Sequence, residues 1–105
     1  MSSIQDTSLY DVFQQAGIPI FYGSAPRGTQ LPYLVYVGAG QDTYNADNTF
    51  YWRQDIFRLE YYFREKSGLM EAEIEVTLLD AGFRYEKSED VYIEDEHVFV
   101  IYYYL

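Results

Sequence analysis

Residues 49–64, TFYWRQDIFRLEYYFR, form the longest strand-like tract of the sequence. From residue 56 to residue 63, a purely apolar and aromatic set of side chains alternates with a set that includes Arg58 and Glu60, with the two-residue period of a β-strand. One set of alternating positions is expected to face a core, and the other set to face water or a partner. The core set is Phe57, Leu59, Tyr61 and Phe63, and the other set is Ile56, Arg58, Glu60 and Tyr62. The tract therefore indicates a sheet protein.

The rest of the chain supplies two helices and further strands. Apolar residues at helical spacing predict helices over about 2–16 and 67–81, with Leu69, Ile74, Leu78 and Ala81 on the apolar side of the second. Gly17 and Gly82 can end these helices in a left-handed conformation. Gly38-Ala39-Gly40 is expected to end a strand at 33–37, and the residues after it to be polar and turn-rich. The other predicted strands cover 18–22, 83–87, 91–94 and 97–105.

This pattern predicts a single α+β domain over residues 1–105. We expect a mostly antiparallel mixed sheet with two α-helices packed on one face. The expected order of elements is α-β-β-β-α-β-β, give or take one strand.

Composition narrows the classes of function. Seventeen acidic and seven basic residues give a net charge of −10, which disfavours binding to nucleic acid phosphates and to anionic membranes. The chain contains no cysteine, and this excludes disulfides, thiolate nucleophiles and Cys-based zinc sites. A secretory signal begins with basic residues, whereas the first one here is Arg27, so we expect folding in a cytoplasm.

No segment carries a strong catalytic or metal-binding motif. Glu94-Asp95-Glu96-His97 is the best metal candidate, but only two of its side chains would share one face of a strand, and a metal site needs three or four ligands. The Asx-rich segment 45–49 has the alternating oxygen ligands of a calcium loop, yet Phe50 and Ile56 stand where that loop needs Gly and Glu. The sequence therefore predicts no cofactor, no metal and no enzymatic activity.

Aromatic residues are in excess of what a core of this size can bury. The chain has 13 Tyr, 7 Phe and 1 Trp, and Tyr and Trp are enriched at protein–protein interfaces. We expect part of the sheet to be covered by a neighbouring subunit; the alternative is a curled sheet that buries both of its faces internally. The candidates for positions outside the core are Tyr22, Tyr36, Tyr44, Tyr51, Trp52, Tyr62, Tyr102 and Tyr104.

Three segments are candidate contact or surface regions. The polar region 38–51 is longer than an ordinary hairpin loop and is expected to protrude toward a partner or an adjacent subunit; the turn 26–30 is a second candidate contact. The candidate interface residues are Arg27, Gln41, Asp42, Tyr44, Asp47, Asn48, Tyr51 and Trp52. The segment 86–96 holds six carboxylates against one lysine and is a candidate acidic surface: Glu86, Glu89, Asp90, Glu94, Asp95 and Glu96.

Several of these segments together resemble the tail terminator, or tail-completion, proteins of long-tailed bacteriophages. They are the block IPIFYGSAPRGTQLPYLVY at 18–36, the NADN turn before an aromatic strand, the LEYYF strand, the helix that ends in GFRY, and an acidic segment before a terminal aromatic strand. The resemblance covers nearly the whole chain, and structural motifs carry it rather than a catalytic signature.

This resemblance implies a virion protein at the head-proximal end of the tail. Such proteins assemble as a sixfold ring on the last ring of the tail tube, stop tube polymerisation and dock the head-completion, or connector, proteins. DNA passes through the ring without specific binding, which suits an acidic wall because like charges repel. In such a ring the acidic segment 86–96 would face either the lumen or the exterior. A competing hypothesis, resting on net charge alone, is an acidic DNA mimic that inhibits a host nucleic-acid-binding protein; a small hydrolase is a third.

Overall fold

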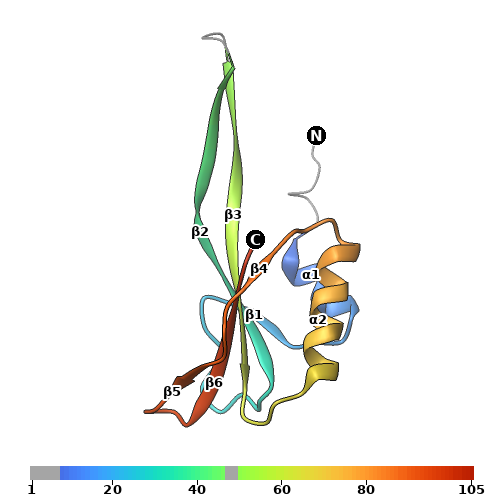
Figure 1. Cartoon of the computed structure of the whole chain (residues 1–105), viewed down its shortest axis with the longest axis vertical. Coiled ribbons are helices and arrows are strands. Elements are labelled where there is room, and N and C mark those ends of the chain that lie inside the picture. Colours follow the sequence, from blue (N-terminus) through green and yellow to red (C-terminus); the bar gives the residue numbers. More distant parts are fainter. Residues whose placement is uncertain (1–7, 47–49) are drawn as a thin grey trace.

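The computed structural model describes residues 8–46 and 50–105, and the side chains of these residues outside 41–55 (Figure 1). The chain is α+β, as predicted, with one strand more than the predicted order. Its elements are α1 (Leu9–Gln15), β1 (Ile20–Tyr22), β2 (Tyr33–Ala46), β3 (Phe50–Phe63), α2 (Gly68–Asp80), β4 (Glu86–Lys87), β5 (Val91–Ile93) and β6 (Val98–Tyr104).

The strands form one mixed sheet in the order β1-β2-β3-β6-β4, with β5 also paired to β6. Only β1 and β2 are parallel; every other pair in the described sheet is antiparallel. The long strand β3 lies at the centre, where Leu59 is opposite Tyr36 of β2 and Tyr103 of β6. The predicted mostly antiparallel sheet is confirmed.

Local signals in the sequence set the ends of the two helices. Ser8 accepts a hydrogen bond from the Asp11 N–H at 3.1 Å, and Ser67 accepts one from the Met70 N–H at 3.1 Å. Such side-chain caps satisfy amide groups that a helix leaves without partners. Gly17 follows α1 with φ of 79°, as the left-handed stop that the sequence predicted.

The core set predicted for β3 is confirmed. Leu59, Tyr61 and Phe63 are buried, and Phe57 is partly buried against the same cluster. In the other set, which is expected to face water or a partner, Glu60 is buried and its neighbours on that face are half-buried. The reason is that the side chains beside Glu60 cover it and hydrogen-bond to it.

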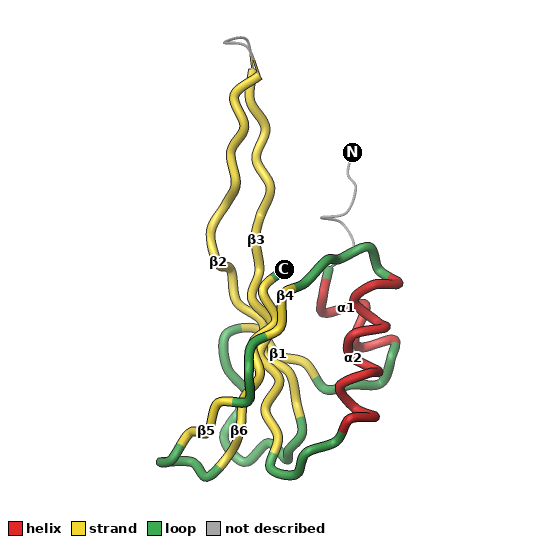
Figure 2. Tube along the Cα trace, in the orientation of Figure 1, coloured by secondary structure: helices red, strands yellow, loops and turns green. Residues whose placement is uncertain are grey.

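The prediction that both helices pack on one face of the sheet is wrong. α1 has seven residues and lies against the edge strand β1, with Leu9 and Phe13 buried (Figure 2). Residues 16–19 alone separate α1 from β1, and this short connection holds α1 at the edge. The longer α2 contributes Ile74 and Leu78 to the same core cluster as Leu9 and Phe13.

The expected apolar side of α2 also needs correction. Ile74 and Leu78 are buried as predicted, but Leu69 is exposed and Glu71 is buried in its place. Glu71 tolerates burial because two lysines approach its carboxylate.

The strand β2 does not end at Gly38–Gly40, as the sequence predicted, but continues to Ala46. A register shift between Gly38 and Gly40 marks a β-bulge, which takes up an extra residue and lets the ladder continue. Pairing with β3 then runs without interruption to Ala46 opposite Phe50. The expected long polar loop is therefore a two-stranded ribbon, whose described residues, 38–46 and 50–56, we call the arm.

The arm gives the molecule its elongated shape. The chain measures 51 × 28 × 24 Å along its principal axes, and in Figure 1 the arm extends along the longest of them, away from the helices. In the described part of the chain no helix has the length and apolar character needed to cross a membrane.

Candidate interaction site

The arm consists of two strands with unpaired outer edges. On the β3 side, β6 ends opposite Arg58, and the Leu105 N–H makes a last hydrogen bond to the Phe57 carbonyl at 3.1 Å. On the β2 side, β1 pairs only as far as Tyr36. Beyond these points each described strand of the arm pairs only with the other.

An arm of this kind is unusual for a chain that acts alone. A two-stranded hairpin is at best marginally stable in water, and unpaired strand edges invite pairing with another chain. Main-chain donors and acceptors along both edges of the arm are therefore available to a partner. The arm is the first candidate contact site.

Five of the eight candidate interface residues lie on the described backbone of the arm. Tyr44 is opposite Trp52, and Tyr51 is opposite Asn45. Gln41 and Asp42 precede them on β2, opposite residues 55 and 54. Asp47 and Asn48 lie outside the described residues.

The eighth candidate residue, Arg27, lies in a different place. It is exposed in the turn between β1 and β2, where the Thr29 hydroxyl donates to the Pro26 carbonyl at 2.6 Å. Gly28 takes a φ of 87°, which a residue with a side chain rarely adopts. The turn that presents Arg27 is thus fixed by its own residues.

A row of aromatic rings lies at the base of the arm. The ring centroids of Tyr22 and Tyr36 are 5.2 Å apart, and those of Tyr36 and Phe57 are 6.1 Å apart, both edge-to-face. Tyr22 is exposed and Tyr36 is half-buried. The row offers Tyr22 as an aromatic contact surface next to the arm.

The other predicted surface aromatics divide between exposed and half-buried positions. Tyr104 is exposed as predicted, whereas Tyr62 and Tyr102 are half-buried. Tyr10 and Tyr92 are exposed although the sequence did not single them out. The feature that could have identified Tyr92 as exposed is its position on a short strand at the edge of the last hairpin, where few residues can cover one face of the strand.

Tyr62 and Tyr102 belong to a polar cluster around Glu60. The Tyr62 hydroxyl donates to Glu60 Oε1 at 2.7 Å, and Arg58 Nε donates to Oε2 at 2.9 Å. The Arg58 guanidinium also lies over the Tyr102 ring, 5.5 Å from its centroid. Burial, and then the hydrogen bond to Glu60, raise the pKa of Tyr62. This face therefore satisfies its own polar groups.

A second charged cluster joins α2 to β4. Lys87 Nζ lies 2.8 Å from Glu71 Oε1 and 2.7 Å from Glu75 Oε2, while Lys66 Nζ lies 2.8 Å from Glu71 Oε2. Burial alone would raise the pKa of Glu71, but the two ammonium groups outweigh it and hold that pKa below its ordinary value. These charges pair with one another and fix α2 against the sheet.

The candidate acidic surface runs along β6 rather than forming one patch. Glu86 on β4 is opposite Tyr104, near the end of β6, whereas Glu94–Glu96 precede the start of β6 at Val98. Six residues of strand separate these ends, about 20 Å. All six acidic side chains are exposed, and Asp90 pairs with Lys66 at 3.0 Å.

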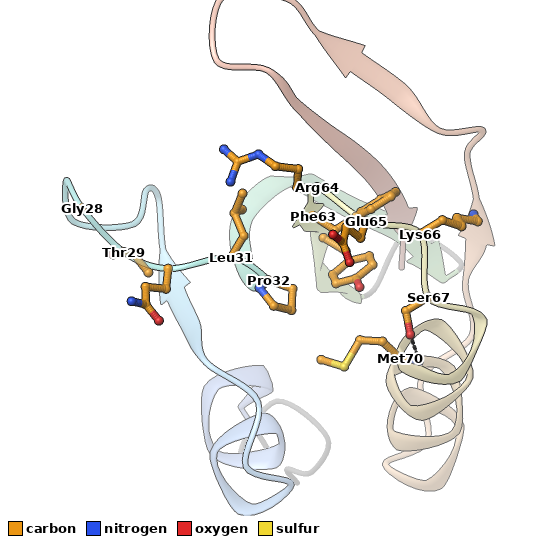
Figure 3. A pocket seen from close by; sticks show the side chains of 12 residues that line it. Gly28, Thr29, Leu31, Pro32, Phe63, Arg64, Glu65, Lys66, Ser67 and Met70 are labelled. Carbon is orange, nitrogen blue, oxygen red and sulfur yellow. Dashed lines mark hydrogen bonds between the residues drawn. The ribbon is translucent and has the colours of Figure 1, made fainter.

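A hollow of about 700 Å³ lies between the turn after β1 and the connection from β3 to α2 (Figure 3). Its lining is mixed, with Leu31, Phe63 and Met70 beside Arg64 and Lys66. It brings together no pair of carboxylates and no histidine. Among the side chains that the structure describes, those of residues 8–40 and 56–105, no group of three or more His, Cys, Asp or Glu is placed to hold a metal ion.

No known protein family matches this sequence, and no curated protein is significantly similar to it.

Proposed function

We propose that this chain is a structural protein of a phage virion. In this proposal it caps the tail tube as a homo-hexameric ring, terminates tail polymerisation and provides the docking surface for the head-completion proteins. The observation that carries the proposal is the arm, a two-stranded ribbon that leaves the body of the protein with both edges unpaired. Such an element is typical of a protein that works by contact with its neighbours.

The proposal assigns a role to each candidate surface. The arm contacts the tube or the adjacent subunit, and its main-chain edges and its aromatic residues supply the contact. Arg27, on its fixed turn, pairs with an acidic neighbour. The exposed carboxylates of 86–96 repel DNA that passes through the ring, because like charges prevent close contact with phosphates.

The test is a variant with a shortened arm. Residues 41–55 are removed, and Gly40 is joined to its cross-strand partner Ile56 through an Asn-Gly turn, which suits a two-residue hairpin. We expect electron microscopy of phage particles made with this variant to show tails of abnormal length without heads. Gln14→Ala, an exposed substitution on α1, is the matched control and is expected to give normal particles.

Two results would distinguish an error in the role of the arm from an error in the proposed function. Normal tails joined to heads in the presence of the shortened arm would show that the arm is not the contact. Normal particles made with no copy of the protein at all would overturn the function itself.

A further inference from the structure

The outward side of α2 is an apolar stripe. Leu69, Val76 and Leu79 are 83%, 55% and 56% exposed, and Ala72 between them is exposed as well. Their spacing of three, four and three residues places them on one side of the helix. The stripe consists of Leu69, Ala72, Val76 and Leu79, and it extends about 15 Å along the helix axis.

The fold does not need this stripe. The opposite side of α2 buries Ile74 and Leu78 in the core, and Lys87 holds the helix through Glu71 and Glu75. A helix that is apolar on two opposite sides is normally buried on both. Single exposed apolar residues are common, but a series at alternating three- and four-residue spacing is the seam of a helix pair.

The stripe continues past the end of the helix. Leu79 also lines an open hollow between α2 and the ends of β4 and β6, together with Tyr85, Tyr104 and Leu105. Tyr104 is itself exposed. An apolar occupant of the stripe therefore gains further contact area in this hollow.

The charges beside the stripe select the occupant. Glu73 and Asp80 are exposed along one border, and Glu86 lies at the hollow, where Arg84 is the only basic residue of the described lining. A second copy of α2 would add the same carboxylates to this acidic border, in a chain whose net charge is −10. Charge complementarity favours a partner with basic residues beside its apolar ones.

We propose that the α2 stripe is a docking site for a basic amphipathic helix of another protein. The partner helix lays apolar residues at three- and four-residue spacing against the stripe and places Lys or Arg beside Glu73 and Asp80. This surface is separate from the arm, so the proposal stands or falls independently of the proposed function.

The probe is a synthetic helical peptide of about four turns that carries leucines at this spacing and lysines beside them. We expect it to bind the full chain and to shift the NMR signals of Leu69, Val76 and Leu79. The double variant Val76→Ser/Leu79→Ser, which leaves the charge unchanged, is expected to weaken binding by at least about tenfold. Tyr92→Ser removes an exposed aromatic residue elsewhere and is expected to bind like the unaltered chain.

Four outcomes would overturn the proposal. The first is that the peptide does not bind at all, and the second is that it binds the double variant equally well, which would leave only attraction to an acidic protein. The third is that a peptide with glutamates in place of the lysines binds as tightly. The fourth is that the double variant dissociates an oligomer of the chain, which would make a second copy the occupant. An unchanged melting temperature of the double variant would show that its loss of binding does not come from a loss of folding.

Discussion

Lys87 neutralises a repulsion between two glutamates of α2 that the sequence alone indicates. Glu71 and Glu75 lie one turn apart on α2, a like-charge spacing that destabilises an isolated helix. In the fold, the Lys87 ammonium lies within 2.8 Å of one carboxylate and 2.7 Å of the other. Burial tends to lower the pKa of Lys87, but hydrogen bonds to both glutamates outweigh it and raise that pKa. One residue from β4 thus turns a repulsive pair into an anchor for α2.

Replacing Lys87 with methionine should therefore destabilise the protein. The substitution keeps most of the side-chain length and leaves Glu71 buried beside Glu75 with Lys66 as its remaining cation. Because Lys87 is partly exposed, we expect a loss of about 1–3 kcal/mol, below the cost of breaking a fully buried pair. Urea unfolding measures it, with Arg84→Met as the matched control. Equal stability of the two variants would contradict the anchor.

The same cluster predicts how stability depends on acid. The folded pKa values of Glu71 and Glu75 lie below the unfolded value of 4.5, since burial, which raises them, is outweighed by their lysine and tyrosine partners. The unfolded chain then binds more protons, so this stabilisation is present above pH 4.5 and is lost as the pH falls through the folded pKa values.

Glu71→Gln should reduce this acid dependence. Urea midpoints measured from about pH 6 to pH 3 are expected to fall less steeply for this variant than for the unaltered chain. Glu73→Gln, an exposed substitution on the same helix, serves as the control. An equal decline in all three proteins would show that other groups govern the acid response.

Among the elements, the arm is predicted to be dispensable for folding. The described core cluster joins the helices to the sheet through side chains from residues 8–40 and 56–105, and the arm residues 41–55 extend beyond the last pairing of β3 with β6 at Arg58. Replacing those residues with an Asn-Gly turn should therefore change the free energy of unfolding by no more than about 1 kcal/mol, the scale of a marginal hairpin. Thermal unfolding followed by circular dichroism tests it. A variant that fails to fold would show that the arm stabilises the sheet below it.

Elements governed by local chemistry could be predicted from the sequence. Ser67 and Gly82 mark the ends of α2, and the alternation within β3 identifies Leu59 and Tyr61 as core residues. These features depend on a few neighbouring residues and on periodicity. The predominance of antiparallel strand pairing could likewise be predicted from the sequence.

The elements that were wrongly predicted depend on residues far apart in the chain. Gly38–Gly40 would end an isolated strand, but pairing with β3 makes it a bulge within a longer one. Leu69 and Ile74 look alike in sequence, and only the partners of α2 decide which is buried. Glu71 is buried because Lys87, sixteen residues away, reaches it.

The candidate site could be predicted only in part, because its form also depends on residues far apart in the chain. A long polar and aromatic region between two strands predicts a protrusion, and the arm lies there (Figure 1). Its form as a paired ribbon was not predictable from residue types. Tyr62 and Tyr102 lie outside the core as expected, but their half-buried cluster with Glu60 and Arg58 was not predictable from residue types.

At the scale of the whole molecule, charge opposes assembly. The chain carries a net charge of −10, and three of the six basic residues whose side chains the structure describes, Arg58, Lys66 and Lys87, are already paired within the fold. Several copies in a ring would bring their exposed carboxylates closer together. Self-repulsion of this kind is strong when ionic strength is low and weak when salt screens it.

Ring formation should therefore require salt or a template such as the end of a tube. The screening length falls from about 30 Å at 0.01 M salt to about 3 Å at 1 M, so purified protein is expected to sediment as monomers in dilute buffer and to form larger assemblies as salt rises. Neutralising the turn before β6, with Glu94→Gln, Asp95→Asn and Glu96→Gln, should lower the salt concentration needed, because these exposed charges contribute to the repulsion. Stable hexamers of the unaltered chain in dilute buffer would contradict this, since contact energy would then exceed repulsion without any screening.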